Sequence, residues 1–291
     1  MSAPQEPRGG MYVESFFLED EIAHIKGPLE DRRVFIECWS RNKLSDFDVV
    51  SVHSLGSNRF DTWSCGDVFW PDYIVDDSPS ARVILFNSDT RVWREPSLGA
   101  IREAADNLMS LLRTARMDSP RERRIIWVTH SLGGFLVKAA CISPAEVLHS
   151  TRNILHDNLK NSTSGAIFMG TSHRAFLMIE EVVNFLSRSH SAIYEHQMRI
   201  FTFYVQHEAS GINLPILVTS FQNGLFHPRE TRETLPGNYL TMCRFQSRLN
   251  PGYERFKYSL EAIRSVPMDL DNSKDINPVI SALYVSNLMY P

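Results

Sequence analysis

Five short apolar runs, separated by segments with helical spacing, constrain the fold of this chain more than any other feature. The runs are FDVVSVH (47–53), ARVILF (81–86), RIIWVT (124–129), GAIFMG (165–170) and PILVTSF (215–221). Near-continuous apolar runs of this length are typical of strands that helices cover on both faces of a parallel sheet. Their alternation with helical segments therefore predicts β-α-β units and a mostly parallel sheet of the α/β class.

Amphipathic helices are predicted between and after these strands. Apolar residues recur at helical spacing from Ile101 to Ala115, and again from Tyr253 to Ile263. The segment 176–206 carries two further helical patterns. Ligands bind parallel sheets beyond the carboxyl ends of the strands. We therefore interpret 176–206 as a small helical cap over that edge of the sheet.

The predicted elements form one main domain. Residues 31–264 hold the predicted strands and helices, and we assign them to this domain. Residues 1–30 begin with a stretch rich in proline, glycine and charge, and are predicted to be a flexible N-terminal segment. Residues 265–291 are predicted to be a C-terminal linker and tail, and 227–238 is predicted to be a loop.

Composition argues against several kinds of partner. Hydrophobic residues make up 43% and charged residues 22%, as in soluble globular proteins, and a net charge of -4 gives no reason to expect nucleic acid. The four cysteines form no CxxC pair, so we expect no disulfide framework, no metal site and no cofactor. The first residues lack an apolar signal region, and no apolar run reaches the roughly 20 residues of a membrane-spanning helix. We expect a cytoplasmic protein with no integral membrane segment.

The segment WVTHSLGGFLVKAA (127–140) is typical of a nucleophile elbow. In such an elbow, a sharp turn from a buried strand into a helix exposes the serine Oγ and directs backbone N–H groups at an oxyanion. Ser131 follows the strand at 124–129, and Gly133 and Gly134 allow the helix to approach that strand closely. Thr129 stands where the elbow usually has its first glycine. We therefore expect Ser131 to be a nucleophile.

Two backbone N–H groups are expected to form an oxyanion hole with this serine. One belongs to Leu132, the residue after the nucleophile. The other is expected in the loop VHSLGSN, which follows the first buried strand, and either Ser54 or Leu55 can provide it. An ordinary connecting loop held by Gly56 is the alternative interpretation of this stretch.

Together, these blocks resemble the fungal lipase-like α/β-hydrolase domains. These domains are related to the serine-active-site-containing proteins and to the N-terminal domains of NACHT-type immune receptors. The resemblance rests on the run from VVSVHSLGSNRFDTW to ARVILFNSDT and on IIWVTHSLGGFLVKAA, TSGAIFMGTSHRAF, LPILVTSFQNG and YLTMCRF, and it covers about Phe47 to Ile263. It implies an α/β-hydrolase-like three-layer sandwich with a Ser–His–acid site acting on lipid esters.

The chain departs from the family at the positions of the catalytic triad. Family members carry an acid near SFQN, where this chain has Asn223, and a catalytic histidine before the MCRF-like block, where it has Tyr239. They also read His-Gly where this chain has His53-Ser54. The resemblance therefore implies a degenerate triad around Ser131.

Other residues can take the missing roles only if the fold brings them to Ser131. His173 and His227 both follow predicted strands at the rim and are candidate bases, and Glu230 is a candidate acid. A base must come within about 3 Å of the serine hydroxyl. His130 is adjacent to Ser131, but adjacent residues on such a turn point in different directions, so we do not assign it as the base.

Three functions are compatible with these residues. The first is a serine ester, thioester or lipid acyl hydrolase that uses Ser131 with a non-standard or missing base and acts on a small-molecule or lipid ester. The second is a catalytically inactive pseudohydrolase that acts in recognition or signalling. The third is a fungal biosynthetic enzyme that carries out acyl transfer or cyclisation in the hydrolase pocket. We favour the first, because the elbow and its glycines are retained.

Overall fold

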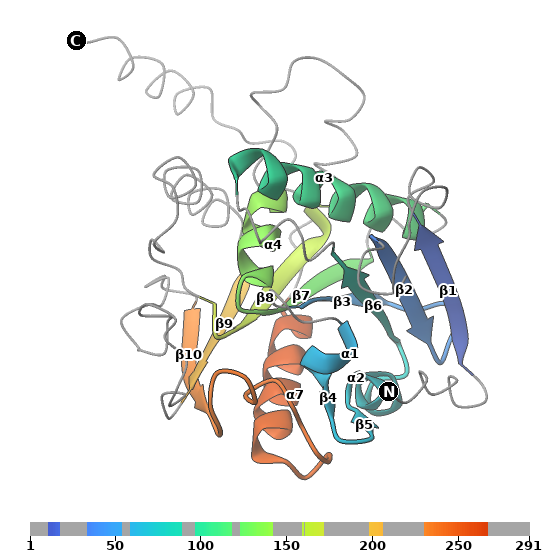
Figure 1. Cartoon of the computed structure of the whole chain (residues 1–291). Coiled ribbons are helices and arrows are strands. Elements are labelled where there is room, and N and C mark those ends of the chain that lie inside the picture. The colour runs from blue at the N-terminus through green and yellow to red at the C-terminus, as the bar shows by residue number, and fades with distance from the viewer. Residues whose placement is uncertain are drawn as a thin grey trace, which may run out of the picture.

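An eight-stranded sheet runs through the described part of the chain, with the strand order β1-β2-β6-β3-β7-β8-β9-β10 (Figure 1). The computed structural model describes residues 11–17, 34–53, 59–88, 97–117, 123–141, 159, 161–171, 198–205 and 230–266. The strands are β1 (Tyr12–Phe17), β2 (Phe35–Ser40), β3 (Phe47–Val52), β6 (Ala81–Asn87), β7 (Arg124–His130), β8 (Thr163–Met169), β9 (Arg199–Val205) and β10 (Glu230–Leu235). A separate two-stranded sheet consists of β4 (Ser64–Cys65) and β5 (Val68–Phe69). The helices are α1 (Arg59–Trp63), α2 (Pro71–Asp77), α3 (Leu98–Ala115), α4 (Gly133–Cys141) and α7 (Pro251–Arg264).

Most of the sheet is parallel. Strands β3, β6, β7, β8, β9 and β10 pair in parallel, whereas β2 runs antiparallel to both β1 and β6. Every residue of β3, β6 and β8 is buried, as expected for strands covered on both faces. The apolar runs at 47–53, 81–86, 124–129 and 165–170 thus correspond to β3, β6, β7 and β8, and the predicted parallel sheet is confirmed.

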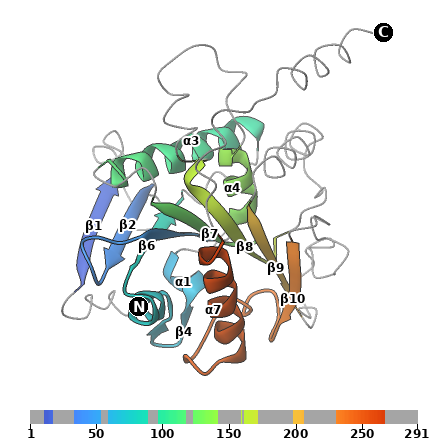
Figure 2. The same ribbon diagram turned by 180° about the vertical axis from the view of Figure 1, so that it is seen from behind.

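Helices cover both faces of this sheet (Figures 1 and 2). Helices α3 and α4 pack on one face, where they share a hydrophobic core with Val50 of β3 and Trp127 of β7. Residues of α1, α2 and α7 form a second core on the other face with Val49 of β3 and Val128 of β7. Because neighbouring residues of one strand enter different cores, the sheet lies between two helical layers, and the predicted three-layer sandwich is confirmed.

Both predicted amphipathic helices are present. In α3 the side chain of Ser97 accepts a 3.1 Å hydrogen bond from the N–H of Ala100, which caps the first turn. The residues that recur at helical spacing in α3 are buried against the sheet (Ile101, Ala104, Ala105, Leu108, Met109, Leu111, Leu112 and Ala115). Helix α7 begins with Pro251 after the capping Asn250 and buries Phe256, Leu260 and Ile263.

The predicted flexible segment 1–30 is wrong at Tyr12–Phe17. These residues form β1, an edge strand that pairs antiparallel with β2 from Tyr12 opposite Ser40 to Phe17 opposite Phe35. The pairing satisfies backbone N–H and C=O groups along one side of the segment. An edge strand of this kind is stabilised by a backbone ladder, which no continuous apolar run marks in the sequence.

Two further predictions fail in the second half of the chain. The helical pattern predicts that 199–205 belongs to the cap, but this segment forms β9. Its residues RIFTFYV are mostly aromatic and β-branched, and they pack into the cores on both faces of the sheet. The polar sequence of 230–235 predicts a loop, but this segment forms the edge strand β10 beside β9. The strand predicted at 215–221 and the cap at 176–197 lie outside the described residues.

Candidate active site

Ser131 lies on a sharp turn between a buried strand and a helix. Strand β7 ends at His130, and α4 begins at Gly133. Ser131 has a φ of 56° and is the one non-glycine residue with a positive φ among the described residues. Such backbone strain in a non-glycine residue is typical of functional sites, and in this position it is the geometry of a nucleophile elbow. The prediction that Ser131 lies on a strand-to-helix turn is confirmed.

Hydrogen bonds from the neighbouring strand hold this turn. The N–H of Ser131 donates to the carbonyl of Met169 at 2.9 Å, and the hydroxyl of Thr171 donates to the carbonyl of Ser131 at 2.9 Å. Both partners lie at the end of β8 or directly after it. The strained backbone of Ser131 is therefore fixed by residues that follow the adjacent strand.

The two glycines after Leu132 are required by close contacts. A Cβ on Gly133 would lie 2.4 Å from the carbonyl oxygen of Val52, at the end of β3. A Cβ on Gly134 would lie 2.4 Å from the side chain of Thr171. Real Cβ atoms do not approach other atoms so closely, so any side chain at either position would push α4 away from the sheet. The predicted reason for this glycine pair is confirmed.

The hydroxyl of Tyr239 is hydrogen-bonded to Oγ of Ser131. Both residues are buried, with exposures of 7% for Tyr239 and 3% for Ser131. The resemblance places the catalytic histidine of active relatives at residue 239. In this chain a phenol hydroxyl therefore contacts the serine at the position where an imidazole is expected.

A compact turn positions Tyr239. The side chain of Asn238 accepts hydrogen bonds from the N–H groups of Leu240 at 3.0 Å and Thr241 at 3.2 Å. Gly237, with a φ of 97°, allows the chain to enter this turn. Beyond the turn, the indole N–H of Trp70 donates to the carbonyl of Cys243 at 2.7 Å, which ties the segment to the second core.

The imidazole of His130 is hydrogen-bonded to the main chain of Tyr239 and not to Ser131 Oγ. Its Nε2 lies 3.0 Å from the main-chain oxygen of Tyr239, and since a carbonyl can only accept, Nε2 carries the proton. The two rings lie 5.2 Å apart. Burial lowers the pKa of His130 to about 4, so the imidazole is neutral near pH 7, and its Nδ1 has no hydrogen-bond partner among the described residues. The sequence interpretation, which set His130 aside as a base, missed that it supports Tyr239.

His53, directly after β3, is also not hydrogen-bonded to Ser131 Oγ among the described residues. Its Nε2 accepts a 3.2 Å hydrogen bond from the N–H of Ser88. Among the described residues, Tyr239 is thus the hydrogen-bond partner of Ser131 Oγ. The candidate bases His173 and His227, and Asn223 at the family's acid position, lie outside the described residues.

Leu132 is the one expected oxyanion donor that lies within the described residues. The N–H of Leu132 follows Ser131 directly and has no backbone acceptor among the described residues. The other candidates, Ser54 and Leu55, lie outside the described residues. The end of β3 reaches this turn, since a Cβ on Gly133 would also lie 2.6 Å from the carbonyl oxygen of His53.

Glu230 is not the acid of this site, and that prediction is wrong. Glu230 lies opposite Ile200 of β9, and Ile200 lies opposite Ala166 of β8. Ala166 in turn lies opposite Trp127 of β7, so Glu230 and Trp127 are at the same level of the sheet. Trp127 is four residues before Ser131, a rise of about 13 Å, and three strand spacings add about 14 Å. A separation of roughly 19 Å excludes direct contact. Instead, the carboxylate of Glu230 accepts a 2.6 Å hydrogen bond from the hydroxyl of Thr202.

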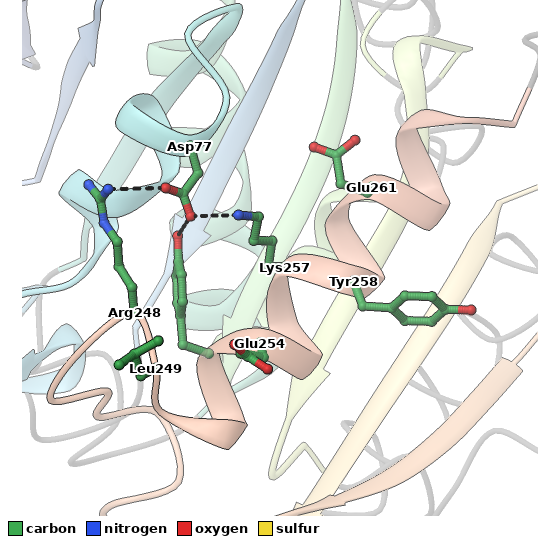
Figure 3. Close-up of a pocket in the computed structure, with 8 residues that line it drawn as sticks. Asp77, Arg248, Leu249, Glu254, Lys257, Tyr258 and Glu261 are labelled. Atoms are coloured by element: carbon green, nitrogen blue, oxygen red, sulfur yellow. Dashed lines mark hydrogen bonds and ion pairs between the residues drawn. The ribbon is translucent and has the colours of Figure 1, made fainter.

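A surface pocket of about 540 Å³ lies away from the elbow, between α2 and α7 (Figure 3). Within it Asp77 accepts hydrogen bonds from Lys257 at 3.0 Å and Tyr253 at 3.1 Å, and pairs with Arg248 at 3.3 Å. Its lining residues are Asp77, Arg248, Leu249, Tyr253, Glu254, Lys257, Tyr258 and Glu261. None of them belongs to β7, α4 or the turn of Tyr239, and we assign the ion pairs a structural role between α2 and α7.

Across the described residues, no group of three histidine, cysteine or acidic side chains is placed to hold a metal ion. None of the four cysteines, all of which lie among the described residues, forms a disulfide bond. Within the same residues, no helix is both long and apolar enough to cross a membrane.

The sheet order, the two helical layers and the strained serine turn define an α/β-hydrolase fold. Solved structures agree. A cold-adapted esterase from an Arctic intertidal metagenomic library superposes with a TM-score of 0.51 at 15% identity, covering 92% of this chain and 100% of that one. The peroxisomal α/β-hydrolase Lpx1 from Saccharomyces cerevisiae gives a TM-score of 0.52 at 10% identity, covering 96% of each chain.

Sequence comparison finds distant relatives. The chain is 27% identical over 157 residues to protein SERAC1 from Bos taurus. This match covers 47% of this chain and 23% of that protein. Human SERAC1 matches to the same extent. The chain thus spans about a quarter of the length of these curated relatives, and no family model matches it. The link to NACHT-type receptors stays a prediction.

Proposed function

We propose that this chain is a serine hydrolase that acts on acyl esters, thioesters or lipid esters, with Ser131 as the nucleophile. The observation that carries the proposal is the φ of 56° at Ser131, on a turn between β7 and α4. Strain of this kind persists only when the surrounding structure over-determines it. Hydrogen bonds from Thr171 and to Met169, and the two close glycine contacts, supply that support.

The proposed reaction begins with attack of Ser131 Oγ on the acyl carbon. The oxyanion formed accepts a hydrogen bond from the N–H of Leu132 and from a second donor, Ser54 or Leu55. Loss of the alcohol or thiol leaves an acyl-serine, which water hydrolyses to the carboxylic acid. Because no imidazole among the described residues bonds Ser131, we expect slow turnover. Loss of a triad member costs about 10⁴-fold in serine hydrolases.

One observation favours the second candidate, a pseudohydrolase that binds an acyl ligand without turning it over. The hydroxyl of Tyr239 bonds Ser131 Oγ where a base is expected. In this case the oxyanion donors would bind the ligand's carbonyl while Ser131 remains unreactive. Covalent reactivity of Ser131 separates the two functions.

The test is covalent labelling of Ser131 by a fluorophosphonate probe, in which Oγ displaces fluoride from phosphorus. We expect labelling of the purified chain at Ser131, located by peptide mass spectrometry, and its loss in Ser131→Ala. Ser110→Ala, at an exposed position on α3, is the matched control. Slow hydrolysis of short p-nitrophenyl esters and thioesters should follow the same pattern. A protein that binds acyl ligands but shows neither labelling nor turnover would instead be a pseudohydrolase.

A further inference from the structure

We propose that Tyr239 is the general base for Ser131 and acts as its phenolate, so that the two residues form a serine–tyrosine dyad. The inference rests on the proposed function of Ser131. It is carried by the direct hydrogen bond between Ser131 Oγ and the Tyr239 hydroxyl inside a buried site. A phenolate oxygen can only accept, so in this form the bond runs from the serine O–H to Tyr239. That is the bond along which a base removes a proton.

The structure holds Tyr239 from three sides. His130 donates to its main-chain carbonyl and lies against its ring. Gly170, with a φ of 59°, leaves room for the ring, because a Cβ there would lie 3.2 Å from Tyr239 Cε2. Asn238 caps the turn on which Tyr239 stands. The phenol oxygen is therefore directed at Ser131 by packing and by main-chain bonds, as a pre-organised base requires.

Few titratable groups near Tyr239 compete for this role among the described residues. The neighbour from β7 is His130, whose pKa of about 4 keeps its imidazole neutral near pH 7. Its proton is on Nε2, which faces the main-chain carbonyl of Tyr239. The end of β8 contributes Gly170 and Thr171, which do not titrate in this range. Farther along the chain, burial raises the pKa of the Cys243 thiol. The charges of Arg244 and of His53, which follows β3, both lower the pKa of His130, so these two groups lie near the imidazole that contacts Tyr239.

Each step of the dyad mechanism balances with water as the second reactant. The Tyr239 phenolate takes the proton of Ser131 as Oγ bonds to the acyl carbon. The resulting phenol then gives this proton to the departing alkoxide or thiolate as the C–O or C–S bond breaks. In the second half of the reaction, the Tyr239 phenolate takes a proton from a water molecule as the water oxygen attacks the acyl carbon of the acyl-serine. The phenol finally returns a proton to Ser131 Oγ, and the carboxylic acid leaves.

The pH dependence of Ser131 labelling tests the dyad. A free phenol titrates near pH 10, so below its pKa the phenolate fraction grows about tenfold per pH unit. We expect the rate of fluorophosphonate labelling of the full chain to rise steeply between about pH 6 and about pH 10. Tyr239→Phe should lower the rate at the alkaline end by about 100-fold or more and abolish the steep rise. Tyr258→Phe, an exposed tyrosine on α7, is the matched control and should behave like the unchanged protein.

A second variant keeps the test decisive if Tyr239→Phe disturbs folding. Replacing Tyr239 by a ring-fluorinated tyrosine keeps the hydroxyl but makes the phenol more acidic. The rise in labelling should then move to lower pH, which attack assisted by free hydroxide cannot do. A rise that does not move, or Tyr239→Phe labelled as fast as the unchanged protein, would overturn the dyad and leave Ser131 as a nucleophile. Absence of labelling at every pH would overturn the proposed function itself.

Discussion

The hydroxyl of Thr171 donates a 2.9 Å hydrogen bond to the main-chain carbonyl of Ser131, and so joins the end of β8 to the turn after β7. The same side chain occupies the space that a Cβ on Gly134 would need. The conformation of the candidate nucleophile is thus set by a residue of the neighbouring strand's loop and not by the local sequence of the elbow alone.

Thr171→Val should therefore impair Ser131 more than it impairs the fold. The substitution keeps the shape of the side chain but removes the hydrogen bond to Ser131, a loss of about 1 kcal/mol in the free energy of unfolding. Misplacement of the nucleophile should slow fluorophosphonate labelling of Ser131 by at least about tenfold, since small misplacements of reacting groups cost up to about 100-fold. Thr114→Val, which removes an exposed hydroxyl from α3, is the control for urea unfolding and for labelling. Unchanged labelling would show that Thr171 does not set the geometry of Ser131.

Tyr239→His should raise the reactivity of Ser131 near pH 7. An imidazole with an ordinary pKa near 6.5 is largely neutral there and can accept the serine proton, whereas a free phenol with a pKa near 10 is almost entirely protonated. We expect labelling and ester hydrolysis to increase by at least about tenfold, below the full effect of general-base catalysis of about 10²–10⁴ because no orienting acid is provided. The double variant Tyr239→His with Ser131→Ala should lose the gain. A rate that stays at the starting level would argue against residue 239 as the place of the base.

Much of the sheet and the elbow could be predicted because their signals are local. Buried parallel strands such as β3 and β6 need apolar side chains on both faces, so they appear as continuous runs. The elbow is marked by Ser131 and the glycines beside it. Strand β10 could not be predicted, because its residues ETRETL are polar and its stability comes from a backbone ladder with β9.

The contacts of the candidate site were harder to predict because they join distant parts of the chain. Tyr239 lies 108 residues after Ser131, and only the order of strands brings the two together. The family resemblance placed Tyr239 at the histidine position, but its hydrogen bond to the serine comes from the structure. Glu230 was assigned as an acid from its position in the sequence, while the sheet registers place it far from the elbow.

Acid should destabilise the fold through His130. Burial lowers the pKa of this imidazole from the usual 6.5 to about 4, so the folded state favours the neutral ring. Above pH 6.5 both states are neutral; as pH falls from 6.5 to 4 the unfolded chain binds the proton first, and stability is lost. The free energy of unfolding should fall by up to about 1.4 kcal/mol per pH unit from this group. Urea unfolding of His130→Gln, which retains a side-chain donor, should show a smaller loss across this range, and an equal loss would contradict the assignment.

Asp48→Asn should be among the most destabilising single substitutions. The fully buried carboxylate of Asp48 pairs with Arg82 at 2.8 Å, with Arg116, and with Arg123 at 3.8 Å. Removing its charge leaves three buried guanidinium groups without this counter-ion, which we expect to cost about 3–5 kcal/mol. Asp76→Asn, which affects the more exposed ion pairs of Asp76 with Arg41 and Arg248, should cost no more than about 1 kcal/mol. Equal urea midpoints for the two variants would show that the buried cluster does not depend on this charge.

Lys138→Met should remove a pH-dependent contribution to stability that the buried Lys138 amine introduces. Lys138 is 1% exposed on α4, with Nζ 5.1 Å from the ring of Phe135 and 5.7 Å from that of Phe168. Burial lowers its pKa from 10.5 to about 7, and the opposing charge of Glu230 offsets only part of this effect. The folded state thus favours the neutral amine, and a charged lysine weakens the fold. A thioether of similar length fills the same space without this desolvation cost.

The pH dependence of stability distinguishes this explanation from a simple gain in packing. Below about pH 7 the amine is protonated in both states and its full cost remains. Between about 7 and 10.5 the unfolded chain binds more protons than the folded one, so the free energy of unfolding should rise with pH by up to about 1.4 kcal/mol per unit. Lys138→Met should lack this rise, whereas Lys43→Met, at an exposed position, should retain it. Parallel curves for the unchanged protein and Lys138→Met would show that the lysine does not titrate differently in the folded state.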